Sequence, residues 1–258
     1  MAQFMSSQGP IARSVADVRL GLEVMSMRDP RDPWWVPAPL RGPKPKEPVK
    51  VALAKIPSDM KTDTKVISLV RKAADHLADS GYDVQEVELP DLNGTWQIWS
   101  DLICTEMAVL QEQAMRQHGS DAFNNAIEAM KGTATILDRE GYMKAIARRS
   151  RVIRNWMMFL EDYPVILSPL SVNQTPGPRA DLESVKRLQE IFWNDLRFMS
   201  SINVLGLPAA VVPVGLIDGK PIGVQIVTSR YREDICLDAA AAIEKKAGTF
   251  VRQLWSRG

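Results

Sequence analysis

Apolar and polar residues recur with two different periods along the chain, which predicts both strands and helices. The clearest pattern lies near the C-terminus, where apolar runs at residues 209–214 and 222–227 flank Asp218 and Gly219. An Asp-Gly pair suits the positive φ angles of a tight hairpin turn. The first run is apolar at every position, as in a strand that is covered on both faces. We therefore predict a hairpin within a core, in a mixed sheet centred on residues 207–228.

A second pattern, at residues 49–89, joins two strand-like runs through an amphipathic segment. Residues 49–54 and 82–89 are strand-like, and the apolar residues between them recur at helical spacing and end at Gly81. This order predicts a parallel βαβ unit. Its first turn lacks a G-x-G-x-x-G motif, so the unit is interpreted as scaffold and not as a nucleotide site. With a further short strand at 165–168, the pattern indicates an α/β fold with a mixed β-sheet flanked by helices.

Helical periodicity dominates most of the remaining sequence. Ser14 followed by Asp17 resembles a capping box and marks the start of the first helix. The helices are predicted at residues 15–27, 98–115, 122–130, 143–160 and 185–199. The long helix at 143–160 carries a basic group that is predicted to form a solvated face, made of Arg148, Arg149, Arg151 and Arg154.

Residues 29–48 carry seven prolines, which exclude regular helix and strand and predict a surface connector. Its neighbouring Trp34 and Trp35 have two interpretations. They either pin the connector to the domain beneath it or form a binding platform, and tryptophans in such a connector more often act as pins.

Composition narrows the class of protein. The 258 residues have 45% hydrophobic content and a net charge of +1, which gives no electrostatic reason to expect nucleic acid or a charged membrane surface. Cys104 and Cys236 stand far apart without other ligands, so two buried free thiols are expected, with neither a disulfide framework nor a zinc site. No apolar stretch is long enough to span a membrane. We expect a cytoplasmic protein that handles a small molecule.

Several segments resemble the amidase signature family of serine amide hydrolases. One is the N-terminal Gly-Pro-Ile-Ala-Arg-Ser-Val-Ala-Asp at residues 9–17, which is followed by a helix and by Asp-Pro-Arg-Asp at 29–32. Another is the C-terminal stretch at 203–227, with Asn203, the Gly-Leu-Pro-Ala step at 206–209 and the return Pro-Ile-Gly-Val-Gln-Ile-Val at 221–227. Their order and spacing also match the family, and the resemblance covers nearly the whole chain.

The resemblance implies that the chain is the C-terminal part of a single amidase domain, in which amides are hydrolysed without a metal or a cofactor. Its expected parts are an opening helix (1–28), a Pro-rich connector (29–48), the βαβ unit (49–90), a helical cover (91–163), core strands with a pocket loop (164–230), and a C-terminal helix and tail (231–258).

The loop after the strand at 165–168 is the candidate site. In open α/β sheets, ligands gather at the carboxyl ends of strands, which is where residues 168–174 fall. The family resemblance likewise implies that this loop walls the acyl pocket, with Ser168, Pro169, Leu170 and Asn173 as substrate-binding residues. Leu170 stands where the family usually has Thr, which alters the polarity of the wall. A purely structural loop remains the alternative.

The family's Ser, cis-Ser and Lys catalytic segment has no counterpart in this sequence, so no catalytic residue is assigned. Residues 1–9 hold Ser6 and Ser7 but do not resemble the Gly- and Ser-rich nucleophile loop. A serine nucleophile needs a base and oxyanion donors. We therefore predict half of a carboxamide hydrolase, whose partners are an amide substrate and either a complementing N-terminal polypeptide or further copies of itself. The alternative is an inactive binding or assembly module.

Overall fold

The computed structural model describes residues 4–180, 183–251 and 255, and within them five strands form one mixed sheet. The sheet order is β2-β1-β3-β5-β4, with β1 parallel to β2 and β3, and β5 antiparallel to β3 and β4. The strands are β1 (Lys50–Ala54), β2 (Asp83–Val87), β3 (Val165–Pro169), β4 (Ala209–Ile217) and β5 (Lys220–Thr228). The mixed sheet flanked by helices and the parallel βαβ unit are both confirmed.

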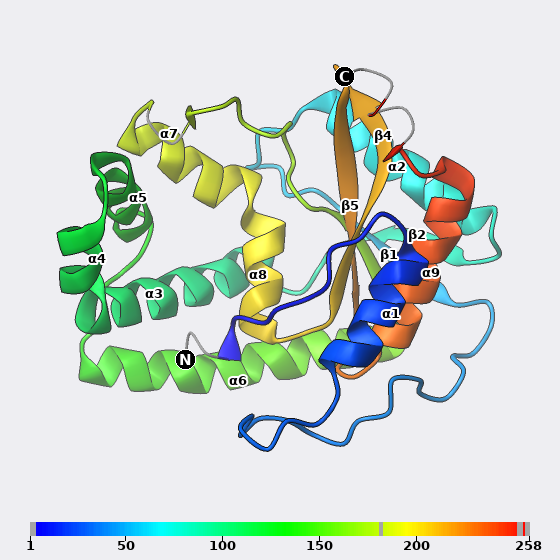
Figure 1. Cartoon of the computed structure of the whole chain (residues 1–258), viewed down its shortest axis with the longest axis horizontal. Helices are drawn as coiled ribbons and strands as arrows, with labels where there is room; N and C mark the ends of the chain where they lie inside the picture. The colour runs from blue at the N-terminus through cyan, green and yellow to red at the C-terminus, as the bar shows by residue number, and fades with distance from the viewer. Residues whose placement is uncertain (1–3, 181–182, 252–254, 256–258) are drawn as a thin grey trace.

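Helices flank this sheet on both sides and extend beyond it as a helical lobe (Figure 1). They are α1 (Val15–Met25), α2 (Thr64–Ala78), α3 (Leu92–Leu110), α4 (Glu112–His118), α5 (Asp121–Lys131), α6 (Arg139–Asp162), α7 (Val185–Glu190), α8 (Arg197–Leu205) and α9 (Glu233–Ala247), with a π-helix (Ile191–Asp195) between α7 and α8. The predicted cap of α1 is confirmed, because the amide of Asp17 donates to Ser14 Oγ.

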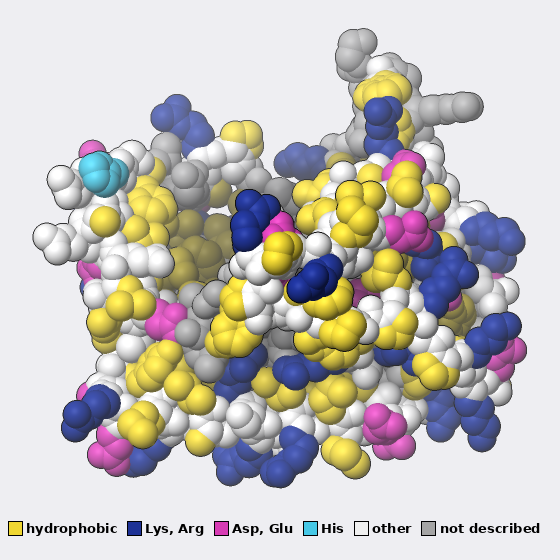
Figure 2. All heavy atoms as spheres, turned by 60° about the horizontal axis from the view of Figure 1, so that its bottom comes forward, with side chains coloured by type: hydrophobic (Ala, Val, Ile, Leu, Met, Phe, Trp, Pro, Cys, Tyr) yellow, Lys and Arg dark blue, Asp and Glu magenta, His cyan; other side chains and the backbone are white. Residues whose placement is uncertain are grey.

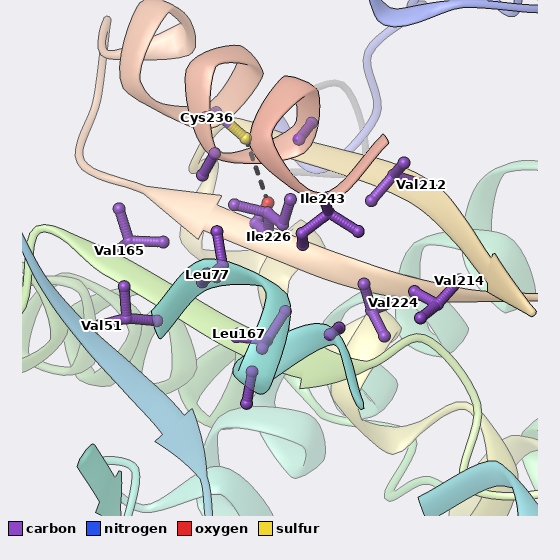
Figure 3. Packing of buried hydrophobic residues seen from close by; sticks show 14 of the residues in the cluster. Val51, Leu77, Val165, Leu167, Val212, Val214, Val224, Ile226, Cys236 and Ile243 are labelled. Atoms are coloured by element: carbon purple, nitrogen blue, oxygen red, sulfur yellow. Dashed lines mark hydrogen bonds between the residues drawn. The ribbon is translucent and has the colours of Figure 1, made fainter. Parts of the chain in front are cut away.

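The first face of the sheet packs against α2 and α9, and its core is apolar. Val51, Val165, Val224 and Ile226 point to this face from three strands, and residues from the two helices interdigitate with them (Figure 3). A single polar contact crosses this layer in Figure 3, where Cys236 Sγ donates to the Ile226 carbonyl at 3.2 Å. Both cysteines are free and buried, as predicted.

The second face packs against α3, α6 and α8. Ala52, Ile166 and Val227 point to this side and join a cluster with Trp156 and Phe198 from the helices. Buried polar residues are concentrated in the elements that cover or form this face; they include Thr95, Ser100, Thr105, Ser168, Asp195, Arg197, Ser200, Ser201 and Gln225. Because buried polar groups need hydrogen-bond partners, the stability of this face depends more on hydrogen bonding than that of the first face.

The predicted hairpin is confirmed, but its predicted position is wrong. Asp218 and Gly219 both have positive φ angles, 49° and 79°, as the two-residue turn between β4 and β5 requires. However, β4 is the edge strand of the described sheet, and only one of its faces is covered. Val212 is 2% exposed on the first face, whereas Val211 on the second is 52% exposed. The apolar run at 209–214 therefore has cover on one side only.

Two predicted helices are each divided in the structure. The helix expected at 98–115 breaks at Gln111, whose φ of −131° is not helical, and α4 turns so that Glu112 pairs with Lys131 of α5. The helix expected at 185–199 contains the π-helix, in which the amide of Leu196 donates to the Ile191 carbonyl at 3.0 Å. Helical periodicity alone does not reveal either break.

The prediction of a solvated basic face on α6 is wrong for one of its four members. Arg148, Arg151 and Arg154 are exposed, but Arg149 is half-buried and donates from Nε to the Val204 carbonyl at 2.7 Å. Burial lowers the pKa of Arg149, and nearby Arg230 lowers it further. Arg149 thus serves the C-terminal end of α8, where carbonyl groups lack helical partners.

The connector at 29–48 has no helix or strand, as predicted. Trp35 donates from Nε1 to the Ser26 carbonyl at 3.0 Å, and Trp34 packs edge-on against Phe4. Both contacts support the pin interpretation. On the face shown in Figure 2, Lys and Arg side chains are interspersed with acidic and hydrophobic ones, so no single-sign patch covers it.

Candidate functional site

The predicted loop leaves the sheet at the edge where parallel strands end. β1, β2 and β3 run in the same direction, so their carboxyl ends share this edge. Ser168 and Pro169 are the last residues of β3 and are buried, whereas Leu170 and Asn173 lie in the loop and are partly exposed. The loop therefore has the position of a ligand-binding segment in an α/β sheet.

Asn173 holds the loop to the π-helix. Its side-chain amide donates to Asp195 Oδ1 at 2.7 Å and to the Lys61 carbonyl at 3.1 Å. Asn194 makes the same pair of contacts, each at 2.8 Å. Asp195 is buried, and its Oδ2 has no partner among the described residues. Asn173 is thus an anchor of the loop, and its side chain is engaged within the protein.

The loop is also tied to the start of α2. Gln174 donates from Nε2 to Asp63 Oδ2 at 2.7 Å, while Asp63 Oδ1 accepts the amide of Lys65 as the helix cap. The hydrogen bond from Gln174, followed by that from the Lys65 amide, lowers the pKa of Asp63. These contacts hold the loop in place without any ligand, so its conformation is fixed by the protein itself.

One cross-strand row of the second face contains two polar residues where β3, β5 and β4 lie side by side. Ser168 is paired in register with Gln225, and Gln225 is paired with Val211. Gln225 is 2% exposed, and its Nε2 has no acceptor among the described residues. A buried amide nitrogen without a partner is destabilising. Gln225 Nε2 therefore needs an acceptor that the described residues do not supply. The sequence analysis missed Gln225 because it lies inside an apolar strand.

Arg197 is a second polar residue that the sequence analysis missed. It is 0% exposed, donates from Nη1 to Asp59 Oδ2 and Asn93 Oδ1, each at 2.7 Å, and donates from Nε to the Trp193 carbonyl. Its guanidinium also lies 3.9 Å from the centre of the Trp193 ring. Arg197 therefore joins the π-helix to the loop that follows β1 and to the first turn of α3. A charged residue within an apolar helical pattern was the available signal.

A cavity of about 410 Å³ lies between α3, the end of α5 and the α7–π-helix segment. Its lining comprises Trp96, Gln97, Gly132, Thr133, Lys186, Gln189, Glu190 and Trp193. None of Ser168, Pro169, Leu170 and Asn173 lines this cavity. The π-helix connects the two regions, because it carries Trp193 in the cavity wall and Asp195 at the loop anchor.

Among residues 4–180, 183–251 and 255, no group of three or more His, Cys, Asp or Glu side chains could hold a metal ion. Of the helices in these ranges, none has the length and apolar character needed to cross a membrane.

Residues 1–237 match the sequence pattern that defines the Amidase family. The chain therefore belongs to the amidase family, as its sequence motifs predict.

Close relatives within this family are indoleacetamide hydrolases. The chain is 61% identical over 255 residues to the indoleacetamide hydrolase of Bradyrhizobium diazoefficiens. The aligned region covers 99% of this chain and 49% of that protein. It is 58% identical over 255 residues to the Bradyrhizobium japonicum enzyme of the same name, covering 99% and 55%. The chain thus spans about half the length of the curated relatives it matches.

The fold agrees with that of solved family members. 6-Aminohexanoate cyclic dimer hydrolase superposes with a TM-score of 0.71 at 24% sequence identity, over 92% of this chain and 54% of that one. At this identity the similarity establishes the fold alone.

Proposed function

We propose that this chain is the C-terminal half of an amidase that hydrolyses an arylacetamide, of which indoleacetamide is the leading candidate. It contributes the sheet core and one wall of the substrate pocket. The Ser, cis-Ser and Lys segment belongs to the N-terminal half of the amidase, which is called the complementing polypeptide below. Two relatives at 61% and 58% identity are indoleacetamide hydrolases, which supports the substrate class.

The observation that carries the proposal is the unfinished second face at β4. Val211 is exposed there beside the buried, unpaired amide of Gln225, and the outer edge of β4 has no strand partner among the described residues. An exposed apolar edge strand favours pairing with another chain segment. A segment that pairs with β4 would cover Val211 and could bring an acceptor to Gln225.

The proposed reaction adds water across the amide C–N bond and releases a carboxylic acid and ammonia. A serine of the complementing polypeptide attacks the carbonyl carbon, and the NH2 group takes up the serine proton and leaves as ammonia. Water then cleaves the acyl-serine ester, which gives the carboxylic acid and returns a proton to the serine. The residues of this chain hold the acyl part of the substrate through the loop at 168–174. Because loss of a nucleophile costs on the order of 10⁶-fold in a serine hydrolase, the chain alone should not turn over amides.

The test is to co-produce this chain with the portion of the Bradyrhizobium diazoefficiens enzyme that precedes its matching region. We expect a stable complex that releases ammonia from indoleacetamide, while the chain alone releases none and is not labelled by a fluorophosphonate. Turnover or labelling by the chain alone would contradict the proposal. A complex that forms but hydrolyses no carboxamide would favour the inactive binding module.

A further inference from the structure

The cavity between α3 and the π-helix is of the right size for a small planar ligand. Its volume of about 410 Å³ falls within the range of about 300–1,000 Å³ that is usual for small-molecule pockets. In Figure 1, α3, α5 and α7 surround this part of the helical lobe. The cavity is separate from the four residues that sequence predicts for substrate binding.

Two tryptophans form a rigid aromatic wall. The Trp193 ring lies 4.6 Å from the Trp96 ring at an interplanar angle of 76°, an edge-to-face arrangement. The buried guanidinium of Arg197 lies over Trp193, whereas Trp96 is 1% exposed and thus held by its surroundings. Trp193 remains partly exposed and presents ring surface to the cavity. Such a preformed wall loses little entropy when another aromatic ring packs on it.

The polar groups around the cavity are mostly neutral. Gln97, Thr133 and Gln189 contribute amide and hydroxyl groups, while the charged Lys186 and Glu190 are exposed. Gln97 Nε2 already donates to Asp101 Oδ1, and Thr133 Oγ1 donates to the Met130 carbonyl. The Trp96 indole N–H has no acceptor among the described residues. Neutral donors and acceptors beside apolar rings suit an uncharged heteroaromatic group better than an anion or a cation.

The cavity is mechanically linked to the loop after β3. Trp193 lies in the cavity wall, and two residues later Asp195 accepts a hydrogen bond from Asn173. The π-helix therefore fixes the cavity wall and the loop anchor relative to each other. π-Helical turns of this kind are frequent at functional sites.

From these observations we infer that the cavity binds the aryl ring of the substrate, with Trp193 as the residue that selects aryl over small aliphatic amides. This inference rests on the proposed function and assigns its aryl specificity to one site. The part of the acyl group next to the carboxamide then lies at the loop at 168–174, and the carboxamide itself faces the complementing polypeptide. Trp193 acts in binding and takes no part in bond making.

The test compares Trp193→Ala, Trp193→Phe and Trp34→Ala in the co-produced complex. We expect Trp193→Ala to lower kcat/KM for indoleacetamide about 10- to 100-fold, mainly through KM, and to change that for acetamide less than about 3-fold. Trp193→Phe should recover most of the loss. Trp34→Ala removes an exposed tryptophan of the connector and should leave both substrates unaffected. Equal losses for both amides, or no loss for indoleacetamide, would overturn the inference.

A second variant avoids disturbing the core. Lys186 is exposed at the cavity, so Lys186→Trp should fold normally and obstruct the opening. In saturation-transfer NMR, the unmodified chain should bind indoleacetamide and Lys186→Trp should lose most of that signal. Equal signals from both proteins would contradict the inference. This readout needs no turnover, so failure of the aryl site and failure of the proposed amidase activity can be told apart.

Discussion

The two faces of the sheet differ in chemistry although the same strands build both. The first face is filled by aliphatic side chains under α2 and α9, with the Cys236 thiol bonded to the backbone. The second face carries the buried Gln225 amide, while nearby Arg197 and Asp195 are buried in its helical cover. Three of these polar side chains retain an atom without a partner among the described residues: Gln225 Nε2, Arg197 Nη2 and Asp195 Oδ2.

This difference separates scaffold from site. Apolar burial stabilises most of the first face, where the buried Thr228 hydroxyl donates to the Arg232 carbonyl. The second face keeps unpaired polar groups in place, which costs stability unless another group supplies the missing contacts. We interpret the first face as the foundation and the second as the side on which an amidase pocket is completed.

The largest effect is expected from an aspartate placed on each face of β4. Val212→Asp buries a carboxylate under α9 and should destabilise the chain by about 4 kcal/mol or more, enough to prevent folding. Val211→Asp stands at an exposed position of the same strand and should cost less than about 1 kcal/mol, yet it should block assembly with the complementing polypeptide. Urea unfolding and co-purification measure the two effects. Equal destabilisation by both variants would remove the difference between the faces.

Arg197 should be the most sensitive polar residue on the second side. Arg197→Ala leaves Asp59 and Asn93 without their buried donor and removes the cover of Trp193, so a loss of about 3 kcal/mol is expected. Arg187→Ala is the matched control. Its exposed ion pair with Glu190 should contribute less than about 0.5 kcal/mol. Thermal and urea unfolding of the two variants measures both losses of stability. Similar losses for Arg197→Ala and Arg187→Ala would show that the burial of Arg197 is unimportant.

The first face should make stability fall at high pH through its thiol. Burial raises the pKa of Cys236 from 9.0 to about 12, so the folded state keeps a proton that the unfolded state loses. The contribution of the protonated thiol to the free energy of unfolding is therefore fully present below pH 9. As pH rises from 9 toward 12, the free energy of unfolding falls by about 1.4 kcal/mol per pH unit. Between pH 8 and pH 10, the unmodified chain should therefore lose more unfolding free energy than Cys236→Ala, which has no thiol to titrate. A constant difference would contradict the burial argument.

The smallest effect should come from Gln225, and its sign should depend on assembly. In the chain alone, Gln225→Met removes a buried amide nitrogen without a partner and should stabilise the fold by about 1 kcal/mol. In the complex, where the missing acceptor is supplied, the same change should weaken association. Chemical denaturation of the chain and a dissociation constant for the complex test the two halves of this prediction. Destabilisation of the chain alone would mean that Gln225 is already satisfied.

The sequence predicts much of the fold because its local signals agree with its tertiary structure. Asp218 and Gly219 adopt the positive φ angles expected of them, and Ser14 caps α1. The loop at 168–174 lies at the expected edge of the sheet because parallel strands direct their carboxyl ends there.

Features that depend on distant partners could not be predicted in this way. β4 is apolar throughout, which indicates cover on both faces, but the described residues cover only one. Asp195 and Arg197 interrupt an apolar helical pattern, yet periodicity gave no sign that both are buried or that a π-helix ends at Asp195. Gln225 lies within an apolar strand, and its importance emerges only from its burial and its unpaired amide.

Amide hydrogen exchange along β4 and β5 offers the most direct measurement of whether the second face is one side of an interface. In the chain alone, the outward-pointing amides of β4 should exchange far faster than those of β5, which is paired on both sides. When the complementing polypeptide is bound, the β4 amides should become as protected as those of β5. If the β4 amides are already fully protected in the chain alone, or stay unprotected in an active complex, then β4 does not receive the missing half.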